Sequence, residues 1–258
     1  MKYTRILILF LAVTLSFAPT SSAWNWNTHS KIVDQVYYSL PASVQANLSL
    51  NAMRDGSNDP DQIFHDFRDH DYPFSYNKAI YYLNLAKSYY NQKKYIQASR
   101  DHGIASHYIS DTFSVPHCVS SEKYSQHQAY ENSADKLIPH ITVVNGDLKT
   151  LLQNGYFSGK TDWYNWEKSK KSYYVQKDLN SAVSVTFLAI TNSLGVNSAL
   201  TNTQLIIPME YVGNKDTKKF HLITCPYVSQ MSSSNKIYFN SRQDAINQGY
   251  IPCKLCNP

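Results

Sequence analysis

Imidazole and carboxylate side chains recur at helical spacing in the middle of the chain. His107 and Asp111 are four residues apart, and so are His127 and Glu131. Residues at this spacing lie on one helix face, about one turn apart. His117 directly follows a proline after the first pair, and proline disfavours continuing the helix. A single pair would more often be a surface contact, but two pairs and a flanking histidine predict a buried cluster of zinc ions.

The first 23 residues have the layout of a secretory signal peptide. A short basic start at residues 1–5 precedes an apolar run at residues 6–17, and small residues end at Ala23. We therefore expect cleavage after Ala23 and a mature chain that begins at Trp24. The apolar run is shorter than the roughly 20 residues of a membrane span, so a permanent anchor is the alternative. The mature protein is expected to be soluble and secreted or extracytoplasmic.

The charge balance excludes one class of function. After residues 1–23, the chain has 22 basic and 19 acidic side chains, a formal charge of +3. This charge would help an anionic surface or substrate to approach, but it is far below that of a protein that coats nucleic acid. The length allows one sizeable core and a small appendage.

Apolar periodicity divides the chain into two parts. From residue 28 to about residue 205 the pattern is mainly helical, whereas short β-prone runs follow Pro208. The sequence therefore predicts a mainly α protein: a multi-helix domain over residues 24–205 and a small α+β zinc-binding module over residues 210–258, with a boundary near residues 202–210. We expect helices over residues 29–40, 76–90, 95–113 and 179–194, a turn-forming loop over 55–60, a β-prone run over 237–239 and a short helix over 241–246.

An N-terminal Trp24, His29 five residues later and the spaced histidine and carboxylate pairs carry a family resemblance. The chain resembles the zinc-dependent phospholipases C and the related single-strand-specific nucleases of the fungal type, over roughly residues 24–131. The resemblance implies a helical hydrolase domain with three zinc ions. It also implies that the amino nitrogen and carbonyl oxygen of the first residue bind zinc.

The resemblance further implies a ligand set for each ion. The first ion would be held by the Trp24 backbone and His29, and Asp111 would bridge it to the second. The second ion would also bind His107, His70 and an acidic residue from residues 55–61. The third would be bound by His117, His127 and Glu131.

Two of these ligand positions could each be filled by either of two nearby residues. Asp61 is preferred to Asp59 because it lies nine residues before His70 and follows a rigid proline. His70 is preferred to His65 because it precedes a helix, as the histidine segment of the family does.

Asp61 and Asp111 are the expected catalytic residues. Paired zinc ions lower the pKa of a water toward neutrality, so that it can attack phosphorus. Asp61 could orient this water or take its proton. Aromatic side chains near the cleft would either stack on a headgroup or base or pack in the core, and the candidates are Phe64, Tyr72, Phe74 and Phe113.

These features favour a secreted zinc-dependent phosphodiesterase, most closely a phospholipase C that hydrolyses headgroup phosphoesters with a metal-activated water. Glu131 favours this branch, because the nucleases generally carry aspartate there, whereas the spacing from Trp24 to His29 is more like that of the nucleases. The alternatives are a single-strand-specific nuclease of the same fold and a non-catalytic binding protein on that scaffold. We expect a monomer that acts on phospholipid or a membrane surface, with nucleic acid as the alternative substrate.

The C-terminal part carries a separate ligand set. His221 and Cys225 are four residues apart, and Cys253 and Cys256 are three apart, the arrangement of a closed structural zinc site. The segment resembles the small zinc module of the Ada DNA-repair methyltransferase, but histidine stands where that protein has its first cysteine, so no repair activity is implied. A disulfide between two of these cysteines is the alternative, and Cys118 is expected to be a buried free thiol. The expected total is about four zinc ions.

Overall fold

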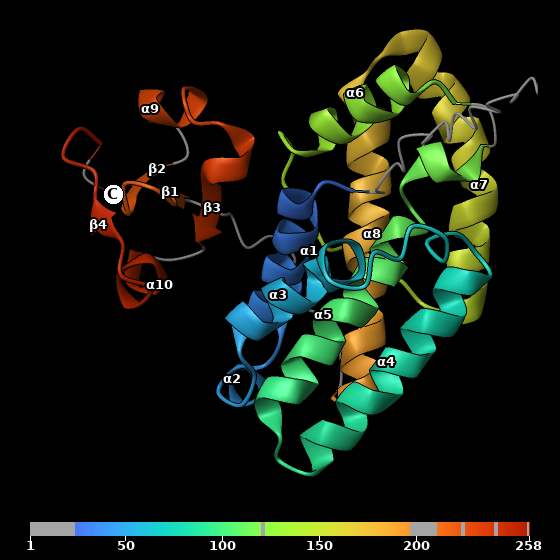
Figure 1. Ribbon diagram of the computed structural model, residues 1–258, viewed down its shortest axis with the longest axis horizontal. Helices are drawn as coiled ribbons and strands as arrows, with labels where there is room; N and C mark the ends of the chain where they lie inside the picture. The colour runs from blue at the N-terminus through green and yellow to red at the C-terminus, as the bar shows by residue number, and fades with distance from the viewer. Residues whose placement is uncertain (1–23, 120–121, 197–210, 223–224, 240–241, 257) are drawn as a thin grey trace, which may run out of the picture.

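The computed structural model describes residues 24–119, 122–196, 211–222, 225–239, 242–256 and 258. These residues form a helical domain and, beside it, a small C-terminal module built around a four-stranded sheet (Figure 1). The predicted fold class is confirmed. The predicted signal peptide and the predicted boundary at residues 202–210 lie outside the described residues.

The helical domain runs from α1 to α8, with a short 3-10 helix, η1, after α5. Each of the four helices expected in this domain is present within a few residues of its predicted ends, except that α8 begins seven residues earlier than expected. The bounds are α1 Trp26–Ser39, α2 Ala42–Gln45, α3 Leu50–Gln62, α4 Phe74–Asn91, α5 Tyr95–Asp111, η1 Val115–Cys118, α6 Tyr124–Ala134, α7 Leu148–Ser169 and α8 Ser172–Leu194.

Local side chains define several helix ends. The Ser49 hydroxyl accepts a hydrogen bond from the Ala52 amide at the start of α3, and Asp147 accepts one from the Thr150 amide at the start of α7. Such caps satisfy amides that have no partner within the helix. Gly195 ends α8 in the left-handed region with φ 67°, a conformation that costs glycine little.

Helix α5 lies at the centre of the domain, where it packs against α3, α4 and α8. Two glycines allow α3 and α5 to cross closely. A Cβ atom on Gly56 would lie 2.0 Å from the Arg100 carbonyl oxygen, and one on Gly103 would lie 2.1 Å from the Met53 carbonyl oxygen. Both helices therefore need glycine at the crossing, and this close packing brings the side chains at the end of α3 beside those of α5.

The predicted turn-forming loop at residues 55–60 is wrong. These residues lie inside α3. Gly56 serves the helix crossing and no turn, and Pro60 lies in the last turn of the helix. Because the helix continues to Gln62, it carries the next carboxylate, Asp61, toward α5.

In its described residues, the C-terminal module contains four short strands, two short α-helices and a 3-10 helix, η2 Ser233–Asn235. The strand order is β3-β1-β2-β4, with β1 antiparallel to both β2 and β3, and β2 parallel to β4. The predicted β-prone run lies in β3, and the predicted short helix corresponds to α10. The bounds are β1 Tyr211–Asn214, β2 Lys219–Leu222, α9 Pro226–Ser229, β3 Lys236–Phe239, α10 Arg242–Asn247 and β4 Ile251–Pro252.

A buried arginine joins the module to the helical domain. Arg54 of α3 donates from Nε to Asp34 Oδ1 at 2.6 Å, and from its two terminal nitrogens to Gln248 Oε1 at 3.1 Å and to the Tyr238 carbonyl oxygen at 3.3 Å. The Tyr238 ring also covers Lys31 of α1, whose Nζ lies 4.7 Å from the ring centroid. The module is thus held against α1 and α3, as Figure 1 shows.

None of the helices in the described residues combines the length and the apolar character needed to cross a bilayer.

Candidate metal centres

The nitrogen and carboxylate ligands expected in the helical domain converge from several segments. They come from the start of the described chain (Trp24), α1 (His29), the end of α3 (Asp61), the α3–α4 connection (His70), α5 (His107 and Asp111), η1 (His117) and α6 (His127 and Glu131). Apart from His117, all of these residues are buried. The structure therefore brings together side chains that are more than 100 residues apart in the sequence.

Asp111 is at the centre of this convergence. Its Oδ2 lies 2.6 Å from His70 Nδ1 and 3.0 Å from His107 Nε2, and its Oδ1 lies 3.2 Å from His29 Nε2. The backbone nitrogen of Trp24 lies 3.5 Å from the same Oδ1. One buried carboxylate thus faces nitrogens on both of its oxygens, which is the position that a bridging ligand requires.

Asp61 approaches the same nitrogens from α3. Its Oδ1 lies 3.6 Å from His107 Nε2 and 3.8 Å from His70 Nε2. Zinc–nitrogen and zinc–oxygen bonds of about 2.0–2.2 Å place two ligands of a tetrahedral ion about 3.3 Å apart. Two overlapping sets have donor atoms within 4.8 Å of one another: His29, Asp61 and His107, and His70, His107 and Asp111. In the part of the chain that the structure describes, His29 Nε2 and His107 Nε2 are buried without a hydrogen bond, so the residues present fit zinc.

A third set lies between η1 and α6. The donor atoms of His117, His127 and Glu131 lie within 4.8 Å of one another. His127 Nε2 is 2.6 Å from Glu131 Oε1, and the rings of His117 and His127 meet edge to face at 4.9 Å. His117 is also 3.8 Å from Asp71 Oδ1, an acidic neighbour that sequence reasoning missed.

The structure distinguishes the alternative ligands, Asp59 from Asp61 and His65 from His70. Both Asp59 oxygens bind the Arg100 guanidinium, at 2.6 and 2.8 Å, so Asp59 is directed toward that arginine, whereas Asp61 faces the cluster. His65 is exposed, with φ 50°, and its Nδ1 contacts the Asp61 carbonyl oxygen at 3.2 Å. The structure therefore places Asp61 and His70, the preferred residues, among the converging ligands.

Polar contacts behind the histidines fix the orientation of their rings. His107 Nδ1 lies 2.8 Å from the Ser57 carbonyl oxygen, and His29 Nδ1 lies 3.1 Å from the Ser110 hydroxyl. The Trp24 indole donates to the Ser110 carbonyl oxygen at 2.9 Å. These contacts direct Nε2 of both histidines toward the cluster, the usual function of groups behind a metal ligand. Ser57 and Ser110 were not predicted, and only their positions beside ligand-bearing segments could have indicated them.

Burial and mutual charge set the protonation of the cluster. Burial alone would raise the pKa of Asp111, but the facing His107 and His29 hold this pKa well below its usual range. Burial and the neighbouring His107 lower the pKa of His29. Burial raises the pKa of Glu131 to about 7. An ionised Asp111 and a neutral His29 are the forms in which these side chains bind a metal.

The four candidate aromatic residues have different environments. Phe113 is buried and packs in the helical core, so it fits the core-packing alternative. Phe64 and Phe74 are 43% and 56% exposed. Tyr72 is partly buried, with its ring 6.3 Å from that of Tyr156.

The module has its own ligand set. His221 of β2, Cys225 at the start of α9, and Cys253 and Cys256 after β4 have donor atoms within 4.8 Å of one another. All of the cysteines, including the half-buried Cys118, are free, so the structure does not contain the disulfide considered as the alternative. The Leu255 amide donates to Cys253 Sγ at 3.4 Å. Three thiols and one imidazole make a closed set of four donors, as in structural zinc sites.

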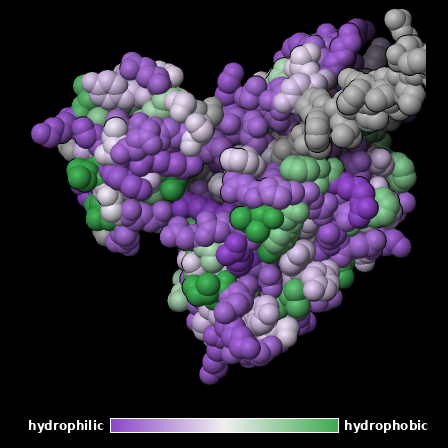
Figure 2. All heavy atoms as spheres, in the orientation of Figure 1, coloured by the Kyte–Doolittle hydropathy of each residue, from purple (hydrophilic) through white to green (hydrophobic). Residues whose placement is uncertain are grey.

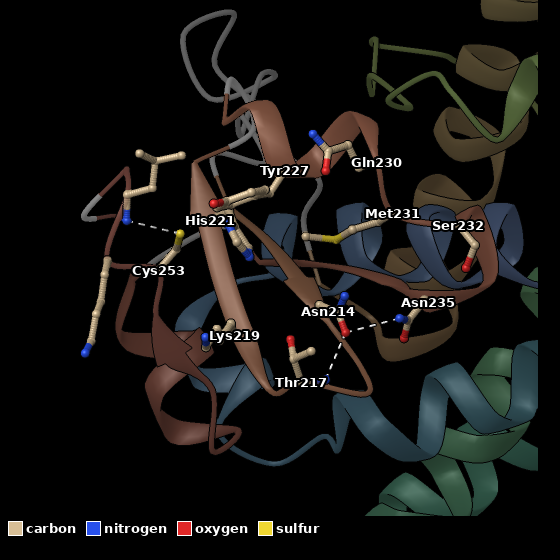
Figure 3. Close-up of a pocket in the computed structure, with 12 residues that line it drawn as sticks. Asn214, Thr217, Lys219, His221, Tyr227, Gln230, Met231, Ser232, Asn235 and Cys253 are labelled. Carbon is tan, nitrogen blue, oxygen red and sulfur yellow. Dashed lines mark hydrogen bonds between the residues drawn. The ribbon is translucent and has the colours of Figure 1, made fainter.

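A groove of about 690 Å³ lies on the module beside this set. Figure 3 shows His221 and Cys253 among its lining residues, with Lys219, Thr217 and the hydrogen-bonded pair Asn214 and Asn235 nearby. It is lined by module residues alone and is separate from the helical cluster.

Comparison with protein families decides the assignment. The family model described as zinc-dependent phospholipase C matches residues 28–194. The chain belongs to this family. A second model, the metal-binding domain of Ada, matches residues 209–258. Both resemblances noted from the sequence are confirmed. No curated protein and no solved structure matches the chain.

Membership of the zinc-dependent phospholipase C family identifies zinc as the metal and phosphodiester hydrolysis as the class of reaction. The four ligands of the module agree with zinc as well. The number of ions, the ligand of each ion and the substrate are not given by membership alone.

Proposed function

We propose that the protein is a phospholipase C that hydrolyses the headgroup phosphodiester of phospholipids, with three zinc ions in the helical domain and one in the module. The observation that carries this proposal is the convergence of Asp61, Asp111 and Glu131 with the histidines into three donor sets, with the Trp24 nitrogen 3.5 Å from Asp111 Oδ1. A binding protein that kept one structural ion would need a single closed set. Export of the mature chain is part of the proposal.

The proposed ligands are the residues of the three donor sets together with the Trp24 backbone, divided among the ions as the family resemblance implies. The first ion would take the Trp24 backbone and His29, the second His70, His107 and Asp61, with Asp111 between them, and the third His117, His127 and Glu131. Zinc, when bound, supplies a Lewis acid that acidifies water and neutralises charge on phosphate oxygens.

The protein side chains position and deprotonate the attacking water. Asp111 is buried and ionised, so it neutralises positive charge at the centre without competing for the proton. Asp61 lies at the end of α3, where the exposed connection to His70 begins, and is the carboxylate proposed to take the proton. The water oxygen then bonds to phosphorus while the bond from phosphorus to the diacylglycerol oxygen breaks. The proton is returned to that leaving oxygen, which gives diacylglycerol and a phosphorylated headgroup.

An exposed apolar surface supports a lipid substrate over nucleic acid. Ile63, Phe64 and Phe67 are 60%, 43% and 41% exposed in the connection that joins Asp61 to His70, and Phe74 is 56% exposed just beyond it. Figure 2 shows an apolar patch at the end of α3, within a mainly hydrophilic face. Single exposed apolar residues are ordinary, but several in one short segment indicate a contact surface. Its place between two proposed ligands suits a lipid surface that presents its phosphates to the site.

An assay on two kinds of diester tests the proposal. The zinc-loaded chain that begins at Trp24 should hydrolyse phospholipid in vesicles faster than single-stranded DNA or RNA at equal phosphate concentration. Replacing Ile63 and Phe64 by serine should lower vesicle hydrolysis about tenfold, through lost apolar contact with the bilayer. Hydrolysis of soluble bis(p-nitrophenyl) phosphate should change less than about twofold.

The matched control is Ile251→Ser, because Ile251 is 64% exposed on β4 of the module. This variant should keep vesicle hydrolysis. A higher kcat/KM on single-stranded nucleic acid than on phospholipid would replace the phospholipase proposal by the nuclease. Zinc binding without turnover of any diester would replace it by the binding protein.

A further inference from the structure

A polar groove of about 510 Å³ lies where the helical domain meets the module. Amide side chains dominate its walls: Asn25, Asn27, Asn58, Gln62 and Asn132. The indole of Trp26, which is 54% exposed, adds one aromatic wall. The groove lies outside the three donor sets described above.

The groove is lined by residues that adjoin proposed ligands in the sequence. Asn25 directly follows Trp24, Gln62 follows Asp61, and Asn132 follows Glu131. Consecutive Cα atoms are about 3.8 Å apart, so three walls of the groove are each one residue from a proposed ligand. The backbone that carries these amides also carries proposed ligands, which supports placing the alcohol substituent of a bound phosphate on this side of the site.

The polar atoms of the groove are matched to hydroxyl groups. Asn58 Oδ1 is buried and, among the described residues, has no hydrogen-bond partner, and such an atom favours a donor from a ligand. Its amide nitrogen is already used, since Nδ2 donates to the Ser30 hydroxyl and to the Arg54 carbonyl oxygen. Amides supply both donors and acceptors, and an aromatic face covers the apolar face of a ring. This combination fits a polyhydroxyl group.

Among the described residues, one carboxylate and one aromatic ring line this groove. The carboxylate that lines it, Asp135, accepts from the Thr28 hydroxyl at 2.8 Å and from Asn27 Nδ2 at 3.3 Å through the same oxygen. Quaternary ammonium groups are usually bound by several aromatic rings, and Trp26 is the one aromatic side chain that lines this groove in the part of the chain that the structure describes. The ammonium of Lys215, which also lines the groove, would repel them.

The module supplies that lysine. Lys215 follows β1, and its Nζ donates to the Ser234 carbonyl oxygen at 3.1 Å across the module surface that borders the groove. Residues 24–208 contain 16 basic and 16 acidic side chains, whereas residues 209–258 contain six and three. The net positive charge of residues 24–258 is therefore carried by the module, and the contacts of Arg54 with Gln248 and Tyr238 hold the module in place.

We propose that this interdomain groove binds the phospholipid headgroup and selects a polyhydroxylated headgroup, a cyclic polyol or sugar, over a quaternary ammonium one. Lys215 of the module is a specificity-determining residue that donates to a headgroup hydroxyl or phosphate oxygen. The inference rests on the proposed phospholipase C activity and adds the class of headgroup and a role for the module.

Binding and turnover measured on the zinc-loaded full chain that begins at Trp24 test the groove. Calorimetry should give about tenfold tighter binding of inositol 1-phosphate than of phosphocholine, since both carry the phosphate and differ in the group that enters the groove. Lys215→Ala should weaken inositol phosphate binding about fivefold and raise KM for phosphatidylinositol in mixed micelles with little change in kcat. Asn58→Asp, which adds a negative charge at the same size, should shift the preference toward phosphocholine.

Lys219→Ala is the matched control, because Lys219 is exposed on β2 and lines the other groove (Figure 3). It should leave both affinities unchanged. Tighter binding of phosphocholine than of inositol 1-phosphate, or equal effects of the two lysine variants, would overturn the headgroup inference. If soluble bis(p-nitrophenyl) phosphate were still hydrolysed, the proposed phosphodiesterase function would stand. No hydrolysis of that soluble diester would overturn the proposed function, and with it this inference.

Discussion

The helical domain and the module hold their candidate metal sites in opposite ways. In the helical domain, imidazoles and carboxylates from widely separated segments converge on a buried centre, and Asp111 alone contacts three histidines. In the module, three thiols and one histidine come from two short segments. Zinc held by three protein ligands keeps a position open to water, whereas four protein donors close the site. The difference supports the proposal that the helical site performs chemistry and the module site holds a small fold together.

The substitution Asp111→Asn tests the catalytic role of the helical site and should have the largest effect. An amide cannot neutralise two dications or bridge them through two anionic oxygens, so kcat/KM on a soluble diester should fall at least about a hundredfold. Circular dichroism should show the helical content retained. Asp59→Asn is the control, since Asp59 binds Arg100 and not the cluster, and it should keep at least about half the activity. Retention of more than about a tenth of the activity by Asp111→Asn would show that it is not the bridge.

The next largest effect is expected from one extra residue before Trp24. The Trp24 nitrogen lies 3.5 Å from Asp111 Oδ1, and as a free amine it could bind zinc after losing a proton near neutral pH. An amide nitrogen has no such lone pair. A chain that begins Met-Trp24 should therefore lose about tenfold or more in activity and bind less zinc than one that begins at Trp24. Equal zinc content and equal activity in the two chains would remove the N-terminus from the ligand set.

The sequence predicts these two regions unequally. The helices and the spaced ligands were predictable because the positions of His107 and Asp111 on one helix face follow from a local period. The choice between Asp59 and Asp61 was less determined, because it depends on how α3 rotates against α5. The turn expected at residues 55–60 failed for the same reason: Gly56 is required by the Arg100 backbone of another helix, which local composition does not reveal. The groove walls, which combine Asn25, Gln62 and Lys215, depend on the docking of the module and could not be foreseen.

Replacing Cys253 by serine should remove zinc from the module site and leave the helical site intact. Removing one thiolate from a closed site of four donors should lower the zinc content from about four to about three ions per chain. The module should become sensitive to proteolysis, while hydrolysis of bis(p-nitrophenyl) phosphate should change less than about twofold, because the proposed catalytic ligands lie in the helical domain. Loss of zinc from the helical cluster in this variant would contradict the separation. Cys118→Ser is the control, since Cys118 belongs to none of the four donor sets.

The smallest effect concerns the junction between the two regions. Lys31 is buried there, and its Nζ donates to the Asp135 and Leu137 carbonyl oxygens at 2.5 and 3.2 Å beneath the Tyr238 ring. Burial lowers the pKa of Lys31 to about 8. In the unfolded chain the pKa of a lysine is about 10.4. Between pH 8 and 10 the unfolded chain therefore binds more protons at this position than the folded chain, so the free energy of unfolding should rise with pH.

The rise should reach about 2 kcal/mol over these two pH units, from about 1.4 kcal/mol for each unit of pKa difference and less at the lower end. Burial raises the pKa of Tyr238 to about 12, so this tyrosine begins to oppose the trend only near pH 10, where an unfolded tyrosine ionises. Urea unfolding of the zinc-loaded protein at pH 8 and 10 measures the slope. Lys31→Met should be less stable at pH 8, because two carbonyl groups lose their donor, and its stability should change less with pH than that of the wild type. Lys254→Met, on the exposed surface of the module, should keep the wild-type slope. An unchanged slope in Lys31→Met would show that the buried Lys31 is not the source of the rise in unfolding free energy between pH 8 and 10.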